Sequence, residues 1–257
     1  MMIHLVDDSS SGVRKALSDT CVDTAAAIKD VEKSQILYDI ILRLAQDEDP
    51  LVRLRIVKKL PIIAAETPTL CLKLTVILKR TFQDSNWRVR KHLGQAMPYV
   101  IKHCGADYFT EHFLSDFLSL LQDPVDEVRS DCAKTVPSFI AAAGATWVFD
   151  KVFPTVKRLL GEGFMIRLGM LSILHGLLLL EISELYTATI IDLFGAAAKD
   201  KVPNIRLRVA KLLGEVARSN RMTDIMRIAI RPILALLSQD KDRDVKFFAA
   251  ESMKICR

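Results

Sequence analysis

Apolar residues recur along this chain with the spacing of an amphipathic helix, and the pattern starts again about every 40 residues. In two successive segments the apolar residues are separated by four, four and three positions: Val52, Ile56, Leu60 and Ile63, then Val89, Leu93, Met97 and Val100. Such steps place side chains on one face of an α-helix. The pattern predicts a helix in each segment with one buried face.

A polar heptapeptide precedes each of these helices. Its copies share an initial Asp (Gly in one copy), Val or Ile at the sixth position and Arg or Lys at the seventh: DSSSGVR, DEDPLVR, DSNWRVR, DPVDEVR, GEGFMIR, DKVPNIR and DKDRDVK. They begin at residues 8, 47, 84, 123, 161, 200 and 240, so they recur every 37 to 40 residues. An Asp with Pro, Ser, Asn or Gly behind it favours a corner whose Asp caps the next helix.

A second amphipathic segment, such as 113–122 or 188–199, lies before each corner. Two helices per repeat of this length are typical of a HEAT-repeat α-solenoid. The sequence therefore predicts an all-α fold of about seven helix pairs, the first incomplete, in a single solenoid over residues 1–257. Pro61, Pro98 and Pro137 occupy the same place in three repeats and predict a bend in the second helix that later repeats lack.

Composition agrees with a folded helical protein. Half of the 257 residues are hydrophobic and 26% are charged, which argues against disorder. The five cysteines show no C-x-x-C spacing, so we expect reduced thiols in an intracellular protein, in the cytoplasm and secondarily the nucleus. The most apolar run, 168–180, is shorter than the roughly 20 residues of a membrane span.

The corner arginines have two interpretations. Arg53, Arg90, Arg129, Arg167 and Arg206 form either a basic ladder for an anionic partner or ion pairs with the corner Asp residues. Opposite charges at matched spacing favour pairing, so we assign these arginines to structure.

The fourth residue of each corner, in contrast, varies in type. Structural positions repeat within a regular array, so positions that vary are available for recognition. Trp87 and Phe164 are aromatic at an apex where little core is available, which favours interface anchors, and Arg88 adds a charge beside the indole. We predict that Trp87 is substantially exposed.

Three stretches resemble the last repeats of the scaffold (A) subunit of protein phosphatase 2A. They are NWRVR at 86–90, LLQDPVDEVR at 120–129 and SQDKDRDVKFFAAESM at 238–253. The resemblance runs over almost the whole chain as the final seven of the family's fifteen HEAT repeats, so we expect a C-terminal fragment or a shortened relative. It implies a non-catalytic adaptor whose C-terminal repeats hold the phosphatase catalytic subunit on their corners. A regulatory B-type subunit would bind the N-terminal repeats that this chain lacks.

By position, the resemblance implies that the corners of four repeats contact the phosphatase. Asp126 stands where the family has a third aromatic residue. The expected protein-binding residues are Trp87, Arg88, Asp126, Phe164, Met165, Pro203 and Asn204.

Alternative functions have weaker support. His103, Cys104 and His112 lack a positioned third group for catalysis and a fourth ligand for a metal, and 161–169 has Ile166 where a dinucleotide loop needs Gly or Ala. We therefore predict no enzyme activity, cofactor or metal.

The net charge of +5 raises nucleic acid as a partner. Residues 206–231 hold seven Lys or Arg against two acids, without an interleaved aromatic to stack on bases. We expect a solvated helix face there instead. A regulatory subunit of a related phosphatase (phosphatase 4 type) and a groove-binding transport adaptor remain open.

Overall fold

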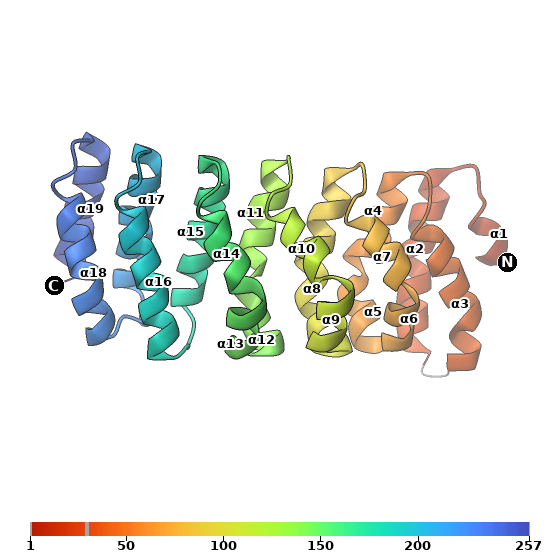
Figure 1. Ribbon diagram of the computed structural model, residues 1–257. Coiled ribbons are helices and arrows are strands. Elements are labelled where there is room, and N and C mark those ends of the chain that lie inside the picture. Colours follow the sequence, from red (N-terminus) through yellow and green to blue (C-terminus); the bar gives the residue numbers. More distant parts are fainter. Residues whose placement is uncertain (1, 29–30, 257) are drawn as a thin grey trace. The chain divides into compact units, whose positions relative to one another are not determined.

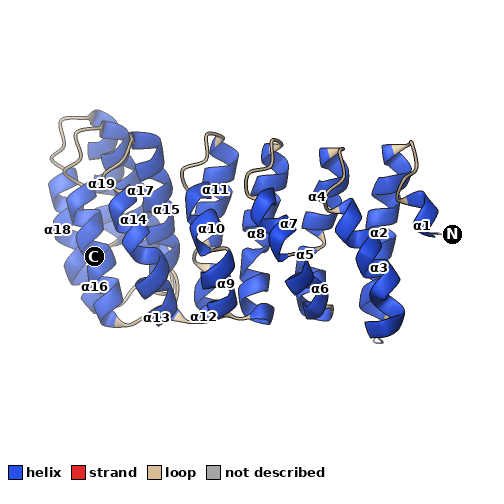
Figure 2. Ribbon diagram, turned by 45° about the vertical axis from the view of Figure 1, so that its right-hand side comes forward, coloured by secondary structure: helices blue, strands red, loops and turns tan. Residues whose placement is uncertain are grey.

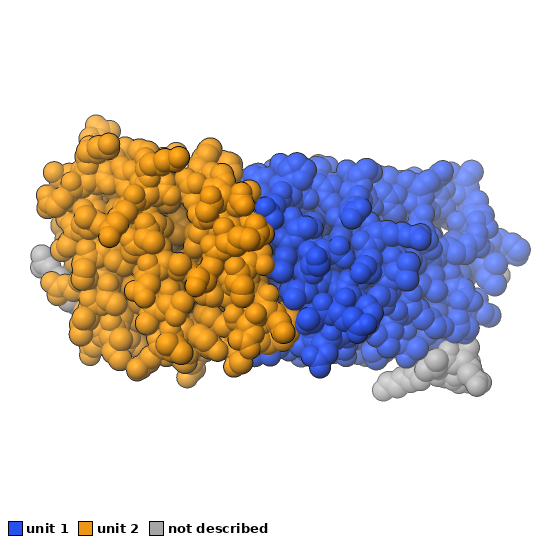
Figure 3. All heavy atoms as spheres, viewed as in Figure 1, with its two compact units in different colours: residues 1–144 blue, residues 145–257 orange. Residues whose placement is uncertain are grey.

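In the computed structural model, the protein consists of helices and connecting loops (Figures 1 and 2). Residues 2–28 and 31–256 are described, and this part of the chain contains no strand. The chain forms two compact units, residues 1–144 and 145–257 (Figure 3). The expectation of one solenoid over residues 1–257 stays a prediction.

Unit 1 is a stack of helix pairs. The second helices of its repeats, α2, α4 with α5, α8, and α11 with α12, pack successively against one another. Its helices are α1 (Met2–Leu5), α2 (Ser11–Ala27), α3 (Val31–Leu44), α4 (Pro50–Lys58), α5 (Leu60–Glu66), α6 (Pro68–Lys73), α7 (Thr75–Thr81), α8 (Trp87–Cys104), α9 (Ala106–His112), α10 (Leu114–Leu120), α11 (Asp126–Thr135) and α12 (Ser138–Ala143).

Unit 2 has the same plan of paired helices, and its second helices are undivided. The second helices α15, α17 and α19 lie side by side, and α16 packs on α18 (Figure 1). Its elements are α13 (Ala145–Trp147), the π-helix η1 (Val148–Val152), α14 (Phe153–Leu159), α15 (Phe164–Leu178), α16 (Glu184–Ala197), α17 (Pro203–Arg218), α18 (Asp224–Leu237) and α19 (Arg243–Ile255).

The apolar period locates the core correctly. All eight residues of the two sequence segments that define the period are buried. Because each second helix buries this stripe against its neighbours and its partner helix, consecutive repeats share a continuous core within each unit.

The proline prediction is confirmed in two of three repeats. The second helix is divided near Pro61 into α4 and α5, and at Pro137 into α11 and α12, whereas α8 continues through Pro98. In unit 2, α15, α17 and α19 are undivided, as expected for repeats without this proline.

Within the described residues, no helix is both long and apolar enough to cross a membrane. All five cysteines are free thiols.

Candidate functional site

Apart from the corner that begins at Gly161, the corners are organised around the carboxylate of their Asp. The Asp84 carboxylate accepts two hydrogen bonds from Arg53 of the preceding repeat, Nε to Oδ2 at 2.7 Å and Nη2 to Oδ1 at 2.8 Å. It also accepts the backbone N–H of Asn86 at 2.9 Å, and Arg90 of its own repeat donates to the Asp84 carbonyl at 2.6 Å. One Asp therefore joins its own loop to the repeat before it.

The predicted pairing of corner arginines is confirmed for four of the five arginines. The same bridge also occurs at Arg14, so the bridged pairs are Arg14–Asp47, Arg53–Asp84 and Arg90–Asp123 in unit 1 and Arg167–Asp200 and Arg206–Asp240 in unit 2.

Arg129 is the exception. It donates to Asp126 of its own repeat at 2.8 Å and to the Asp123 carbonyl, while its buried Nε has no hydrogen-bond partner among the described residues. In the sequence, Gly161 replaces the Asp of the following corner, so that corner has no carboxylate at the bridging position, and its Glu162 pairs with Arg158 instead.

The capping prediction needs a correction. The helix N-cap is the residue two positions after the corner Asp, for example Asp49, Asn86 or Asp242, and its side chain accepts the free N–H groups of the first turn. The corner Asp instead accepts the N–H of that N-cap residue. At Asp84, for example, Oδ1 accepts both this N–H and the Nη2–H of Arg53, while Oδ2 accepts the Nε–H of Arg53.

The electrostatics of these pairs follow from this geometry. Hydrogen bonds from Arg206 lower the pKa of Asp240 below its ordinary value, against the opposing effect of burial. For Asp123, burial acts to raise the pKa, but the bonds from Arg90 and from the Val125 N–H outweigh it, and the pKa is lowered. Both carboxylates are therefore held in their charged form.

Trp87 is less exposed than predicted. Its side chain opens α8 and is only partly accessible, because the Arg88 guanidinium lies 4.4 Å and the Lys91 ammonium 5.8 Å from the indole ring centre. The prediction of a substantially exposed indole is therefore wrong in extent, because the Trp87 side chain is partly covered. Trp87 and exposed Arg88 together present a cation stacked on an aromatic surface.

The corner residues of unit 2 are open to solvent. Phe164 and Met165, at the start of α15, are 44% and 43% exposed, and Pro203 and Asn204 at the start of α17 are exposed as well. Asp126, in unit 1, is exposed and paired with Arg129. Within each unit these residues share the corner end of the second helices, and their role in binding stays a prediction.

The candidate catalytic residues make separate contacts. The Cys104 thiol hydrogen-bonds the thiol of Cys71, and the His112 ring packs edge-on against Tyr108 with 4.7 Å between ring centres. His103 is exposed in the last turn of α8. Among the described residues, no group of three or more His, Cys, Asp or Glu is arranged to hold a metal ion.

Much of the basic cluster at 206–231 is engaged within unit 2. Arg206 is buried against Asp240, Arg208 donates to the Ser172 hydroxyl at 3.3 Å, and the Lys211 ammonium lies 4.1 Å from the Phe248 ring centre. These contacts are those of a structural helix face.

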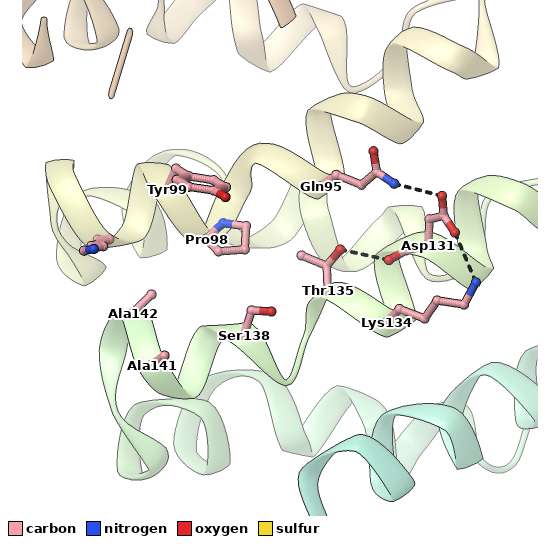
Figure 4. A pocket seen from close by; sticks show the side chains of 10 residues that line it. Gln95, Pro98, Tyr99, Asp131, Lys134, Thr135, Ser138, Ala141 and Ala142 are labelled. Atoms are coloured by element: carbon pink, nitrogen blue, oxygen red, sulfur yellow. Dashed lines mark hydrogen bonds and ion pairs between the residues drawn. The ribbon is translucent and has the colours of Figure 1, made fainter. Parts of the chain in front are cut away.

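Sequence reasoning missed a second set of cross-repeat contacts and a groove. Arg55 pairs with Asp19 at 3.2 Å, Lys59 with Asp23 at 2.6 Å, and Gln95 donates to Asp131 at 2.9 Å, each over 36 residues. The constant separation of 36 was a signal that could have revealed these pairs. The groove is lined by α8, α11 and α12 (Figure 4).

Comparisons with known proteins agree with this geometry. No protein-family model matches the sequence. Over 122 residues the chain is 30% identical to a Saccharomyces cerevisiae protein, the regulatory A subunit of protein phosphatase PP2A. The archaeal HEAT-like repeats protein from Thermococcus onnurineus NA1 matches with a TM-score of 0.52 at 14% identity, covering 97% of this chain and 98% of the archaeal one. The chain is a HEAT-repeat protein that resembles the A subunit of protein phosphatase 2A.

The alignment with the yeast A subunit covers 44% of this HEAT-repeat chain and 19% of the yeast protein. A chain in a structure that describes Kap95p binding to RanGDP matches 99% of the HEAT-repeat chain with a TM-score of 0.72, at 14% identity and over 35% of that chain. The structural likenesses establish the HEAT fold, and the sequence likeness to the yeast A subunit extends over less than half of the chain.

Proposed function

We propose that this HEAT-repeat protein is a scaffold that binds the catalytic subunit of a type 2A serine/threonine phosphatase through its corner residues. The sequence similarity to the yeast PP2A scaffold supports the partner class. The structural support is the exposed Phe164–Met165 pair at the start of α15, together with Trp87 and Arg88 at the start of α8.

The chemistry of these corners suits protein recognition. Phe164 and Met165 are adjacent, apolar and nearly half exposed, although their helix buries a complete apolar face elsewhere. Aromatic and Met side chains are enriched at the centres of protein interfaces, where their burial supplies most of the affinity. An indole already stacked with a guanidinium is partly ordered before binding, which reduces the entropy lost on association.

Calorimetric titration of the full chain with purified phosphatase 2A catalytic subunit tests the proposal. Phe164→Ala and Trp87→Ala should each weaken binding by a factor of about 30, since loss of a buried aromatic anchor costs about 2 kcal/mol. Leu185→Ala is the matched control, because Leu185 is 73% exposed on α16, away from the corners.

The proposal is wrong if the wild-type chain produces no binding heat, or if both corner variants bind as tightly as the Leu185 variant. Repeating the titration with a type 4 catalytic subunit determines which phosphatase class the corners prefer.

A further inference from the structure

A groove in unit 1 has the properties of a second binding site. It has a volume of about 430 Å³ and lies where the later turns of α8 face α11 and α12. Figure 4 shows Pro98 and Tyr99 on the α8 side, and Ser138, Ala141 and Ala142 on the side of α12. The α8 residues of this groove lie about two to four helical turns from Trp87, so the groove is separate from the corner residues.

The centre of the groove is apolar and open. Tyr99 is 47% exposed, and its ring lies beside Pro98 and opposite two alanine side chains that leave the space unfilled (Figure 4). The volume is within the range of clefts that accept ligand groups. A single apolar side chain of a partner would cover the tyrosine ring without displacing any described side chain.

One end of the groove carries more positive than negative charge. The Asp131 carboxylate accepts Gln95 at 2.9 Å and is paired with Lys91 at 3.1 Å and Lys134 at 3.3 Å. One carboxylate therefore faces two ammonium groups, and the Lys134 side chain is 72% exposed. The pKa of Asp131 is lowered, because these lysines outweigh the effect of burial, so the carboxylate is already satisfied.

The remainder of the groove carries unmatched hydrogen-bonding groups. Lys102 is exposed, and no carboxylate of the described residues lies within ion-pair distance of its ammonium. The hydroxyls of Tyr99 and Ser138 have no hydrogen bond to another described residue. Lysines on the lining of an apolar groove, with free hydroxyls between them, complement a chain that carries carboxylates and peptide groups.

We propose that this groove binds a short acidic peptide segment of a partner protein. One apolar side chain of the segment packs on Pro98 and Tyr99, its carboxylates pair with Lys102 and Lys134, and its backbone hydrogen-bonds Ser138. Nucleic acid is disfavoured, because Tyr99 is the one aromatic side chain on the lining and offers a single ring for stacking bases.

Fluorescence anisotropy with the full chain tests the proposal. The probe is a fluorescein-labelled nine-residue peptide, Glu-Asp-Glu-Asp-Leu-Asp-Glu-Asp-Glu, and its matched control has Gln and Asn in place of Glu and Asp. We expect saturable binding of the acidic peptide only, weakened at least about tenfold when salt rises from about 50 to 300 mM. Lys102→Glu and Lys134→Glu should each weaken binding about tenfold, whereas Lys151→Glu, an equal charge change at an exposed residue of η1, should not.

Ala141→Trp provides a charge-independent test, because the indole would occupy the groove and block the peptide with Lys102 and Lys134 intact. Thermal unfolding followed by circular dichroism verifies that each variant is folded. The proposal is overturned if the neutral peptide binds equally well, if the groove variants bind like Lys151→Glu, or if a nine-nucleotide single strand displaces the peptide at equal concentration. Binding of the phosphatase catalytic subunit should be unchanged in Lys102→Glu, which separates this proposal from the corner site.

Discussion

The guanidinium of Arg53 holds the carboxylate of Asp84, which lies 31 residues later in the chain, by two parallel hydrogen bonds. The Asp84 side chain is 5% exposed and that of Arg53 17%. Removing either partner would leave a desolvated charge, because few water molecules can replace the lost bonds. We therefore expect a substitution that removes one partner of this pair to destabilise the fold.

Arg53→Ala should lower the free energy of unfolding by about 2 kcal/mol, because Asp84 would lose both side-chain bonds while remaining buried. Urea unfolding followed by circular dichroism measures the change. Arg55→Ala is the control: the Arg55–Asp19 pair is 52% and 36% exposed, so its loss should cost less than about 0.5 kcal/mol. Equal losses for the two variants would contradict a special role of the corner pairs.

Asp240→Asn should reduce stability at neutral pH and have a smaller effect in acid. Because Arg206 lowers the pKa of Asp240 in the folded state, the pair stabilises fully above the unfolded Asp pKa of about 3.9. This stabilisation is lost as pH falls through the folded pKa. Thermal unfolding should therefore show a constant difference between wild type and variant from about pH 5 to 7 that shrinks below about pH 4; a difference that grows in acid would disprove the coupling.

Gly94→Ala should destabilise unit 1 although alanine favours helices. A Cβ at residue 94 would lie 2.4 Å from the Cys132 sulfur, so we expect a loss of about 1 to 3 kcal/mol. Cys132→Ala removes that sulfur and should make the Gly94 substitution less costly in a double-mutant cycle. Gly169→Ala is the matched control in α15, since its Cβ would meet nothing within 4 Å, and it should gain up to about 1 kcal/mol.

Cys104 should be the most reactive of the five thiols. Its hydrogen bond with Cys71 lowers its pKa, and it is partly accessible, whereas burial raises the pKa of Cys21 to about 11 and also raises that of Cys132. Thiolates are the reactive species, so iodoacetamide should modify one thiol rapidly, at a rate that reaches half its plateau at a lower pH than for an ordinary cysteine. Mass spectrometry of the native chain identifies the site. Rapid modification of Cys132 in the folded chain, or an undiminished fast phase in Cys104→Ser, would contradict this prediction.

Local periodicity was sufficient to predict the helices and their buried faces. Steps of four, four and three identified Val52, Ile56, Leu60 and Ile63 as core, and the recurrence of Asp and Arg identified the ion pairs. The same regularity did not determine which Asp each Arg pairs with. The Asp six residues earlier in the same corner and the Asp about 33 residues later in the next corner were both compatible with pairing.

Features that depend on side-chain conformation were harder to predict. The accessibility of Trp87 depends on where the flexible Arg88 and Lys91 side chains settle, which no sequence period determines. Tyr99 and Ser138 line one groove only because α8 packs against α12, and the exposure of Tyr99 depends on the small alanines opposite it. Similarly, the proline at equivalent positions divides the helix at residues 61 and 137 but not at residue 98.

The shared corner Asp has a consequence for how such arrays change in length during evolution. Five corner carboxylates use the Arg of the repeat before them, and each of these arginines also donates to a backbone carbonyl of its own corner. Duplication or deletion of a whole bridged repeat therefore keeps an Arg for each of these Asp residues. Loss of part of a repeat, in contrast, leaves one Asp or one Arg without its partner. Gene rearrangements that keep the period intact would thus be tolerated far more readily than those that interrupt it.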